Sequence, residues 1–325
     1  MLLESAKIII GFALLIYGAE ILVRGASNVA KRFHIPEIII GLTIVSIGTS
    51  MPELIITVTS ALENHTDLII GNAIGSDICN FLFILGFMSI FKPVKIDKET
   101  RKIHLPAAII STVILLIMAN GIFGTEKFFI SKTKGLILLA FGIIYFAYPV
   151  FIEIKDIIKT NNKEKKKKSK KNKKEINLFK ATVNIIIGII LLKYGSDFVV
   201  ENATLIAEQL KIAQSIIGLT VIAIGTALPE IVTSIIAIIK KDTDMAVGNL
   251  IGSSVINSCL IIGIGAIINP FAFVPRFNID LVFLLCITLF IWLFSIFNKK
   301  NTLTRSAGVF QVTLFIIYIV RLFMV

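Results

Sequence analysis

Residues 39–86 and 216–263 are two copies of one sequence. They align without a gap at a constant offset of 177 residues, and 20 of the 48 aligned positions are identical. Both copies contain the pattern G-T-x-x-P-E, followed by G-N-x-I-G-S-x-x-x-N. Most identities fall on Gly, Thr, Pro, Glu, Asn and Ser, although the surrounding sequence is apolar. A duplication that keeps polar residues inside apolar segments is the strongest indication of function in the chain.

The apolar sequence around the copies predicts an integral membrane protein. The chain of 325 residues is 56% hydrophobic with a mean hydropathy of +0.89, which is more apolar surface than a soluble fold can bury. A helix crosses a bilayer with about 20 apolar residues, and ten segments of roughly this length or more are present. The ten predicted spans are residues 7–23, 36–62, 68–91, 103–121, 135–152, 180–200, 212–239, 245–268, 279–297 and 303–323.

The duplication extends over two halves, residues 1–152 and 180–325, which are joined by a basic linker at 153–179. Gly11 and Gly18, for example, match Gly188 and Gly195 at the same offset. Each half contains five predicted spans, and five is odd, so the second copy enters the membrane from the opposite face. The sequence therefore predicts an all-α integral membrane fold of ten transmembrane helices in two inverted five-helix repeats. This arrangement is typical of secondary transporters.

The positive charge of the chain is distributed asymmetrically. The formal net charge is +12, but its distribution indicates membrane topology and not nucleic-acid binding. In a ten-span chain, the loops after the first, third, fifth, seventh and ninth spans share one side of the membrane. Together with Lys180 and Arg305, in the first turns of the spans that follow, these loops carry 25 of the 33 Lys and Arg residues. The positive-inside rule predicts a multi-pass plasma-membrane protein with these loops, including the basic central loop, in the cytoplasm and both termini outside. For the lysine-dense run Lys163–Lys174, contact with anionic lipid and a merely solvated loop both remain open.

A proline interrupts the second and seventh predicted spans. Pro52 has no N–H to donate to the carbonyl of Gly48, and Pro229 leaves the carbonyl of Gly225 without a partner in the same way. Inside a bilayer, a freed carbonyl must face protein, water or an ion. The neighbouring backbone carbonyls of Ser46 and Ala223 are therefore candidate cation ligands.

A carboxylate follows each of these prolines. Glu53 and Glu230 lie near the middle of their predicted spans, where an ionisable group costs roughly 3 kcal/mol on insertion scales. Such an acid needs a bound cation, a proton or a basic partner. The middles of spans 36–62, 68–91, 212–239 and 245–268 contain no Lys or Arg. A cation is therefore the favoured explanation, and a protonated, hydrogen-bonded Glu is the structural alternative.

The polar residues of the next spans supply further oxygen donors. Ser76 and Asn80 are four residues apart and share a helix face, as do Ser253 and Asn257, and Asp77 lies at the edge of the first face. Cys and His are scattered, so an oxygen site for a hard cation such as Ca²⁺ or Na⁺ is favoured over a soft-metal site. The candidate metal ligands are Glu53, Glu230, Thr49, Ser50, Ser76, Asp77, Asn80, Thr226, Ser253 and Asn257, with the carbonyls of Ser46 and Ala223.

These motifs resemble those of the cation/Ca²⁺ exchanger superfamily and are closest in pattern to the Na⁺/Ca²⁺ exchangers. The resemblance covers nearly the whole chain and implies an antiporter, not an enzyme, that exchanges Ca²⁺ for Na⁺ without a cofactor. Three positions depart from the family pattern. Ala227 replaces a Ser, Asn257 replaces an Asp that is common in related exchangers, and Asp77 adds a charge beside Ser76. These departures leave the Na⁺ stoichiometry and a role for K⁺ open.

Three other functions compete with Na⁺-coupled exchange. Coupling of Ca²⁺ to H⁺ or K⁺ is one, although H⁺/Ca²⁺ exchangers of the superfamily typically carry G-N-x-x-E. A cation channel also suits paired acids, but broken helices in inverted halves suit a carrier better. An intramembrane hydrolase needs a paired nucleophile and base, for which the sequence shows no signature.

Overall fold

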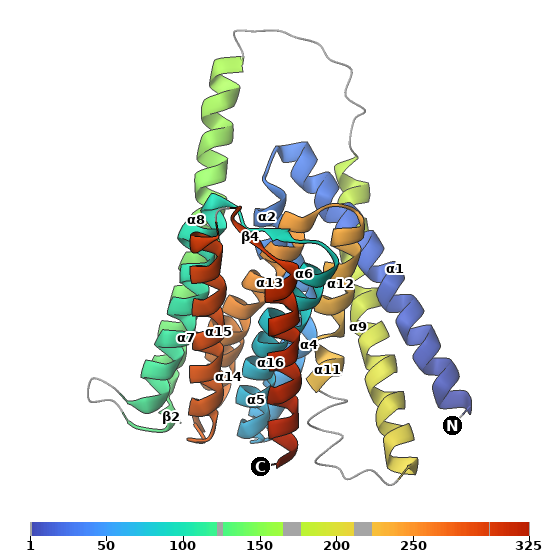
Figure 1. Ribbon diagram of the computed structural model, residues 1–325, viewed down its shortest axis with the longest axis vertical. Helices are drawn as coiled ribbons and strands as arrows, with labels where there is room; N and C mark the ends of the chain where they lie inside the picture. Colours follow the sequence, from blue (N-terminus) through green and yellow to red (C-terminus); the bar gives the residue numbers. More distant parts are fainter. Residues whose placement is uncertain (1, 122–125, 165–176, 211–222, 299, 325) are drawn as a thin grey trace.

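Long helices form nearly all of the described part of the chain in the computed structural model (Figure 1). The structure describes residues 2–121, 126–164, 177–210, 223–298 and 300–324. The first half contains α1 (Leu2–Phe33), α2 (Glu37–Ile40), η1 (Gly41–Val45), α3 (Ser46–Thr49), α4 (Met51–Leu62), α5 (Thr66–Ile78), η2 (Cys79–Ile84), α6 (Leu85–Phe91), β1 (Val94–Lys95), η3 (Thr100–His104), α7 (Leu105–Asn120), β2 (Phe129–Ile130) and α8 (Lys132–Glu164). The second half contains α9 (Leu178–Gln209), α11 (Ala223–Thr226), α12 (Leu228–Ile239), α13 (Thr243–Val255), η5 (Ile256–Ile261), α14 (Ile262–Ile268), β3 (Phe271–Ala272), α15 (Phe277–Phe297), β4 (Thr302–Leu303) and α16 (Arg305–Met324).

The prediction of a helical membrane protein is confirmed. In the described residues, eight helices are long and apolar enough to span a bilayer, and the bent pair Glu37–Thr49 and Met51–Leu62 makes a ninth if it is counted as one span. The shorter apolar helix α12 belongs to the seventh predicted span, whose first part lies in residues 211–222, outside the described residues. Most of the lysine run Lys163–Lys174 also lies outside the described residues. The count of ten spans stays a prediction.

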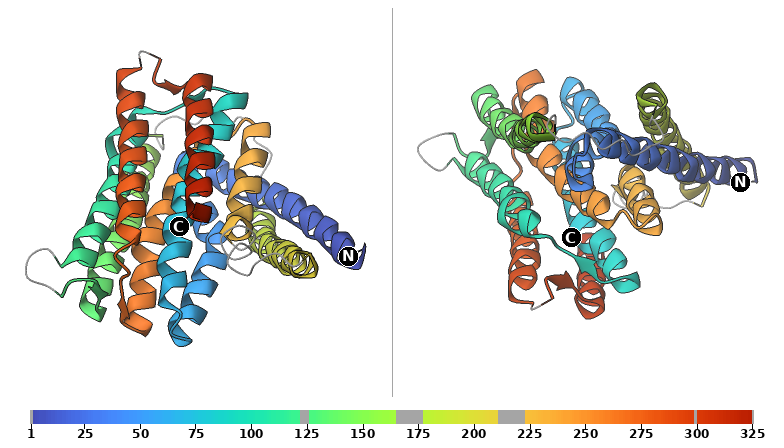
Figure 2. Two further views of the ribbon diagram at one scale, coloured as in Figure 1. Left: turned by 60° about the horizontal axis from the view of Figure 1, so that its bottom comes forward. Right: turned by 90° about the horizontal axis from the view of Figure 1, so that it is seen from above.

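Helices α1 and α9 run antiparallel along each other and lie on one side of the molecule, inclined to the other helices (Figures 1 and 2). Small residues allow their backbones to touch. A Cβ added to Gly188 would lie 2.9 Å from the carbonyl oxygen of Gly18, and one added to Gly195 would lie 2.9 Å from that of Gly11. Gly11 and Gly18 are the counterparts of Gly188 and Gly195 in the duplication. Equivalent helices of the two halves therefore cross through equivalent residues and in opposite directions.

The short strands join the two halves in the same reciprocal way. β1 pairs antiparallel with β4, with Val94 opposite Leu303, and β2 pairs antiparallel with β3, with Phe129 opposite Ala272. β1 and β3 are related by the 177-residue offset, so each half pairs its first strand with the second strand of the other half. Helix α6 likewise packs against α16, and its counterpart α14 packs against α8.

Four π-helical turns, η1, η2, η3 and η5, lie in the described residues. η2 and η5 are related by the 177-residue offset, and Asn80 and Asn257 are the second residues of these turns. A π-turn displaces the regular ladder of backbone hydrogen bonds and often marks a functional position. Gln311 of α16 supports η2, because its Nε2 donates to the carbonyl of Phe81 at 2.9 Å.

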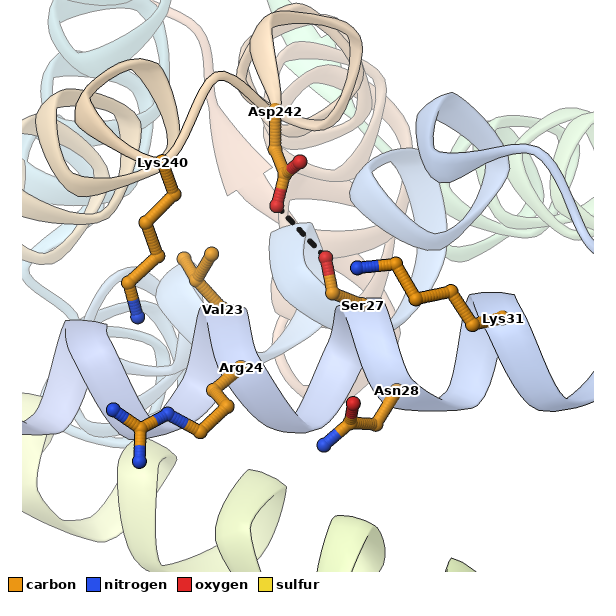
Figure 3. Close-up of a pocket in the computed structure, with 7 residues that line it drawn as sticks. All are labelled: Val23, Arg24, Ser27, Asn28, Lys31, Lys240 and Asp242. Carbon is orange, nitrogen blue, oxygen red and sulfur yellow. Dashed lines mark hydrogen bonds between the residues drawn. The ribbon is translucent and has the colours of Figure 1, made fainter. Parts of the chain in front are cut away.

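One end of α1 is tied to the turn between α12 and α13. The Ser27 hydroxyl donates to Asp242 Oδ2 at 2.8 Å and also lies 3.3 Å from Glu37 Oε1. A pocket of about 250 Å³ opens beside this contact, with Arg24 and Asn28 directed to the opposite side of α1 from Asp242 (Figure 3). The lining of this pocket includes none of the predicted cation ligands.

Candidate cation site

Both G-T-x-x-P-E motifs lie at helix breaks. Ser50 (φ −81°, ψ 10°) separates α3 from α4, and the span bends by 46° between the segments Glu37–Thr49 and Met51–Leu62. Ala227 separates α11 from α12 at the equivalent position of the second copy. The predicted breaks are therefore confirmed. Each break places a Glu in the first turn of a new helix, where the amide end of the helix dipole stabilises negative charge.

In the second copy, the carbonyl group that Pro229 leaves without its helical partner faces protein, as predicted. The carbonyl oxygen of Gly225 accepts a hydrogen bond from Ser196 Oγ of α9 at 2.8 Å. The position equivalent to Ser196 in the first half is Ala19, which has no hydroxyl. The two breaks are thus supported differently by the pair α1 and α9.

The structure brings the two predicted acids together. Glu53 and Glu230 are both fully buried, and their carboxyl groups lie close enough for a direct electrostatic interaction. Ser50, at the first break, donates to Glu230 Oε1 at 3.2 Å and so links the first copy to the acid of the second. Oε2 of each Glu has no hydrogen-bond partner within the described part of the chain. Two buried carboxylate oxygens are therefore available to a ligand.

A serine of the following helix donates a hydrogen bond to each of the two acids. Ser76 Oγ of α5 donates to Glu53 Oε1 at 3.2 Å, and Ser253 Oγ of α13 lies 3.4 Å from Glu230 Oε1. The two contacts are equivalent in the duplication. Ser50 and Ser253 also lie 3.1 Å apart, hydroxyl to hydroxyl. Hydroxyl groups of α5, α13 and the first break therefore surround the two acids.

The two predicted threonines contact asparagines of the opposite half. Thr49 Oγ1 donates to Asn249 Oδ1 at 3.1 Å, and Thr226 Oγ1 donates to Asn72 Oδ1 at 3.3 Å. Thr49 is equivalent to Thr226 and Asn72 to Asn249, so the duplication relates the two contacts to each other. Asn72 and Asn249 therefore connect helices of the two halves.

The two predicted backbone ligands lie just before the breaks. The hydroxyl of buried Ser46 bonds to the carbonyl of Leu42, while the Ser46 carbonyl accepts the Ser50 N–H at 3.0 Å. Ala223 is the first residue of α11, four residues before the second break. The structure thus keeps the Ser46 carbonyl within a regular helical hydrogen bond.

The remaining predicted residues form a cluster at η2 and η5. Asn80 is fully buried, and neither its Oδ1 nor its Nδ2 has a hydrogen-bond partner among the described residues. Asp77 Oδ1 accepts from Asn257 Nδ2 at 2.9 Å, and Asp77 Oδ2 accepts from Ser258 Oγ at 2.9 Å. Ser258 was not among the predicted residues, because its counterpart in the first copy is Phe81.

Oxygen dominates the chemistry of this site. Among the described residues, the ion pairs include none of the three fully buried acids of this site, Glu53, Asp77 and Glu230. No cluster of three or more His, Cys, Asp or Glu residues with metal-binding geometry occurs in the same part of the chain. A cation here would be held by a mixture of carboxylate, hydroxyl and amide oxygens, which suits hard cations.

Comparison with known proteins gives a consistent result. A family model described as sodium/calcium exchanger protein matches residues 5–151 and 180–324. The chain is 30% identical over 328 residues to the inner membrane protein YrbG of Escherichia coli (strain K12), covering 99% of this chain and 98% of YrbG. It is 28% identical over 288 residues to the sodium/calcium exchanger MaX1 of Methanosarcina acetivorans, covering 81% and 82% of the two chains.

The fold is also similar to solved structures. A structure of the sodium-calcium exchanger NCX_Mj superposes with a TM-score of 0.81 at 28% sequence identity, over 99% of each chain. Family model, sequence relative and solved structure thus agree over both halves of the chain. The protein belongs to the sodium/calcium exchanger family of membrane transporters.

Proposed function

We propose that the protein is a secondary antiporter that moves Ca²⁺ across the membrane in exchange for Na⁺. The observation that carries this proposal is the buried pair Glu53 and Glu230, which come from equivalent helix breaks and are connected through Ser50. Exchangers of the family transport cations without a cofactor and are not enzymes. The names of MaX1 and NCX_Mj support Na⁺ as the coupling ion.

The proposed cation ligands are oxygens of the two breaks and of the helices that face them. Glu53 and Glu230 supply the charge, and neither of their Oε2 atoms has a hydrogen-bond partner among the described residues. Ca²⁺ takes about 6–8 oxygen ligands, and this set can provide them with oxygens to spare for smaller Na⁺ sites. The other proposed ligands are Thr49, Ser50, Ser76, Asn80, Thr226, Ser253 and Asn257, with the backbone carbonyls of Ser46 and Ala223.

The proposed architecture is ten transmembrane helices in two inverted five-helix repeats, residues 1–152 and 180–325. The antiparallel crossing of α1 with α9 and the reciprocal pairing of β1 with β4 and β3 with β2 support this symmetry. In such a carrier the binding site lies between the repeats and opens to each side of the membrane in turn. Ser196, which bonds the freed Gly225 carbonyl, gives α9 a direct connection to one break.

Obligatory exchange follows from the charge of the site. Two or three buried acids are costly in the bilayer unless cations compensate them. Either one Ca²⁺ or several Na⁺ ions can do this, and both need the same carboxylates for charge compensation, so their binding is mutually exclusive. The empty anionic site is penalised in a closed state, which means that the transporter changes sides with one ion or the other bound.

The coupling ion is tested by flux into proteoliposomes. We expect ⁴⁵Ca²⁺ uptake to be driven by Na⁺ trapped inside the vesicles and to stay at background when K⁺ or a pH gradient replaces the Na⁺ gradient. Uptake that follows the K⁺ or pH gradient would instead establish a K⁺- or H⁺-coupled exchanger. Uptake that proceeds at the same rate without any opposing gradient would indicate a channel.

The proposed topology places both termini outside a multi-pass plasma-membrane protein and the basic loops in the cytoplasm. Both termini lie towards the same end of the molecule, and the β1–β4 pair lies at the other end (Figure 1). In a variant lacking Cys79, Cys259 and Cys286, we expect Leu2→Cys to react with a membrane-impermeant maleimide on intact cells. Lys300→Cys, in the loop before α16, should react only after permeabilisation. The reverse labelling pattern would show that the orientation is inverted.

A further inference from the structure

We propose that Asp77 is a positioning residue that holds the side chain of Asn257 with its carbonyl oxygen free for the transported cation. This inference rests on the proposed function and assigns a role to the third buried acid of the site. Asp77 acts through Asn257 and does not contact the ion itself.

The hydrogen bonds around Asp77 fix the orientation of the amide. Asp77 is fully buried, and both its oxygens accept, Oδ1 from Asn257 Nδ2 and Oδ2 from Ser258 Oγ, each at 2.9 Å. Because Asp77 Oδ1 is the acceptor in this contact, the NH₂ group of Asn257 and not its carbonyl oxygen faces the carboxyl group. Asn257 Oδ1 consequently points elsewhere, and it is a buried oxygen without a hydrogen-bond partner in the described residues.

The equivalent asparagine of the first copy, Asn80, has no such contact with a carboxyl group among the residues that the structure describes. Asn80 is equally buried, but neither atom of its amide is held by a hydrogen bond within the described part of the chain. The residue equivalent to Asp77 in the second copy is Ser254, which carries no charge. Orientation by a carboxylate is therefore specific to Asn257.

Two substitutions that keep the number of side-chain heavy atoms separate orientation from charge. Asp77→Asn keeps an acceptor for Asn257 Nδ2 but removes the charge, whereas Asp77→Leu removes the acceptor. Loss of an outer partner typically lowers metal affinity about 10- to 100-fold. We expect calorimetric Ca²⁺ binding to the purified protein to weaken by this factor in Asp77→Leu and to change by no more than about threefold in Asp77→Asn.

A double-substitution cycle tests whether Asp77 acts through Asn257. If it does, adding Asp77→Leu to an Asn257→Ala variant should weaken Ca²⁺ binding no further, because the oriented amide is already absent. Ser89→Ala is the control, since this buried hydroxyl donates to the Leu85 carbonyl of its own helix at 2.8 Å. It should bind Ca²⁺ like the unchanged protein. The melting temperature of each variant without Ca²⁺ reports any purely structural loss separately.

The outcomes distinguish the positioning role from the proposed function. Asp77→Asn binding Ca²⁺ as weakly as Asp77→Leu would overturn the positioning role, as would additive effects in the cycle or a melting temperature that falls while Ca²⁺ affinity stays unchanged. An unchanged protein that binds Ca²⁺ and exchanges it for Na⁺ leaves the proposed function intact in all three cases. If the unchanged protein binds neither ion, the proposed function itself is wrong, and the positioning role fails with it.

Discussion

Glu53→Gln and Glu230→Gln should each abolish Na⁺-gradient-driven ⁴⁵Ca²⁺ uptake into proteoliposomes. Glutamine has nearly the same size as glutamate and can still accept the hydrogen bond from Ser76 or Ser253, so each substitution removes mainly one negative charge. Outer partners of a metal site are worth roughly 10- to 100-fold in affinity, and a charged direct ligand should be worth about 100-fold or more. The measurement is initial uptake at a Ca²⁺ concentration that saturates the unchanged protein.

Glu20→Gln is the matched control for these two variants. Glu20 is another acid on a long apolar helix, but its side chain is 40% exposed and pairs with Arg24 of the same helix at 2.6 Å. Exposed pairs of this kind contribute little, so uptake should stay close to that of the unchanged protein. Wild-type uptake in both buried-acid variants would remove the basis for assigning Glu53 and Glu230 as cation ligands.

Gly252→Ala should destabilise the protein and impair Ca²⁺ uptake. An added Cβ would lie 2.5 Å from the carbonyl oxygen of Leu42 and 2.7 Å from Ser46 Oγ. This backbone cannot move away without separating α13 from η1, and overpacking of this kind costs about 1–3 kcal/mol. Because Ser253 follows Gly252 directly, the separation would also displace a proposed ligand. The melting temperature of the detergent-solubilised protein, with uptake measured in parallel, tests this prediction.

Gly142→Ala is the control for this effect. A Cβ there would approach Leu260 Cδ2 to 2.7 Å, but that atom is the end of a side chain that can rotate. We expect a smaller fall in melting temperature than for Gly252→Ala. Equal melting temperatures for Gly252→Ala and the unchanged protein would show that α13 does not pack on η1 as closely as the structure indicates.

The sequence was sufficient to predict the helical membrane fold and the two breaks. Apolar length indicates a span directly, and Pro52 and Pro229 each remove a backbone hydrogen bond in the middle of a predicted span, which favours a kink or break there. The shared face of Ser76 and Asn80 follows from helix periodicity. The constant offset of 177 residues also matched each residue of the first copy to its equivalent in the second. The two acids could therefore be assigned to one site from the symmetry of the two halves.

Contacts between the halves could not be predicted in the same way. Periodicity describes one helix and does not say which helix faces it, so the bond from Ser50 to Glu230 and the crossing of Thr49 with Asn249 appeared only in the structure. Comparison of the two copies also could not identify polar residues that are present in only one of them. Ser258 aligns with Phe81, and Ser196 aligns with Ala19, so neither was marked as a conserved polar position within the duplication.

A Ca²⁺ or Sr²⁺ peak in anomalous diffraction from crystals of the protein is the most direct test of a cation held between the two acids. We predict a peak in contact with both carboxyl groups, at about 2.3–2.6 Å from oxygens of Glu53 and Glu230 for Ca²⁺. In Glu53→Gln crystals grown in the same way, this peak should be weak or absent. A strong peak remote from both residues, or none at saturating Ca²⁺, would contradict the proposed site.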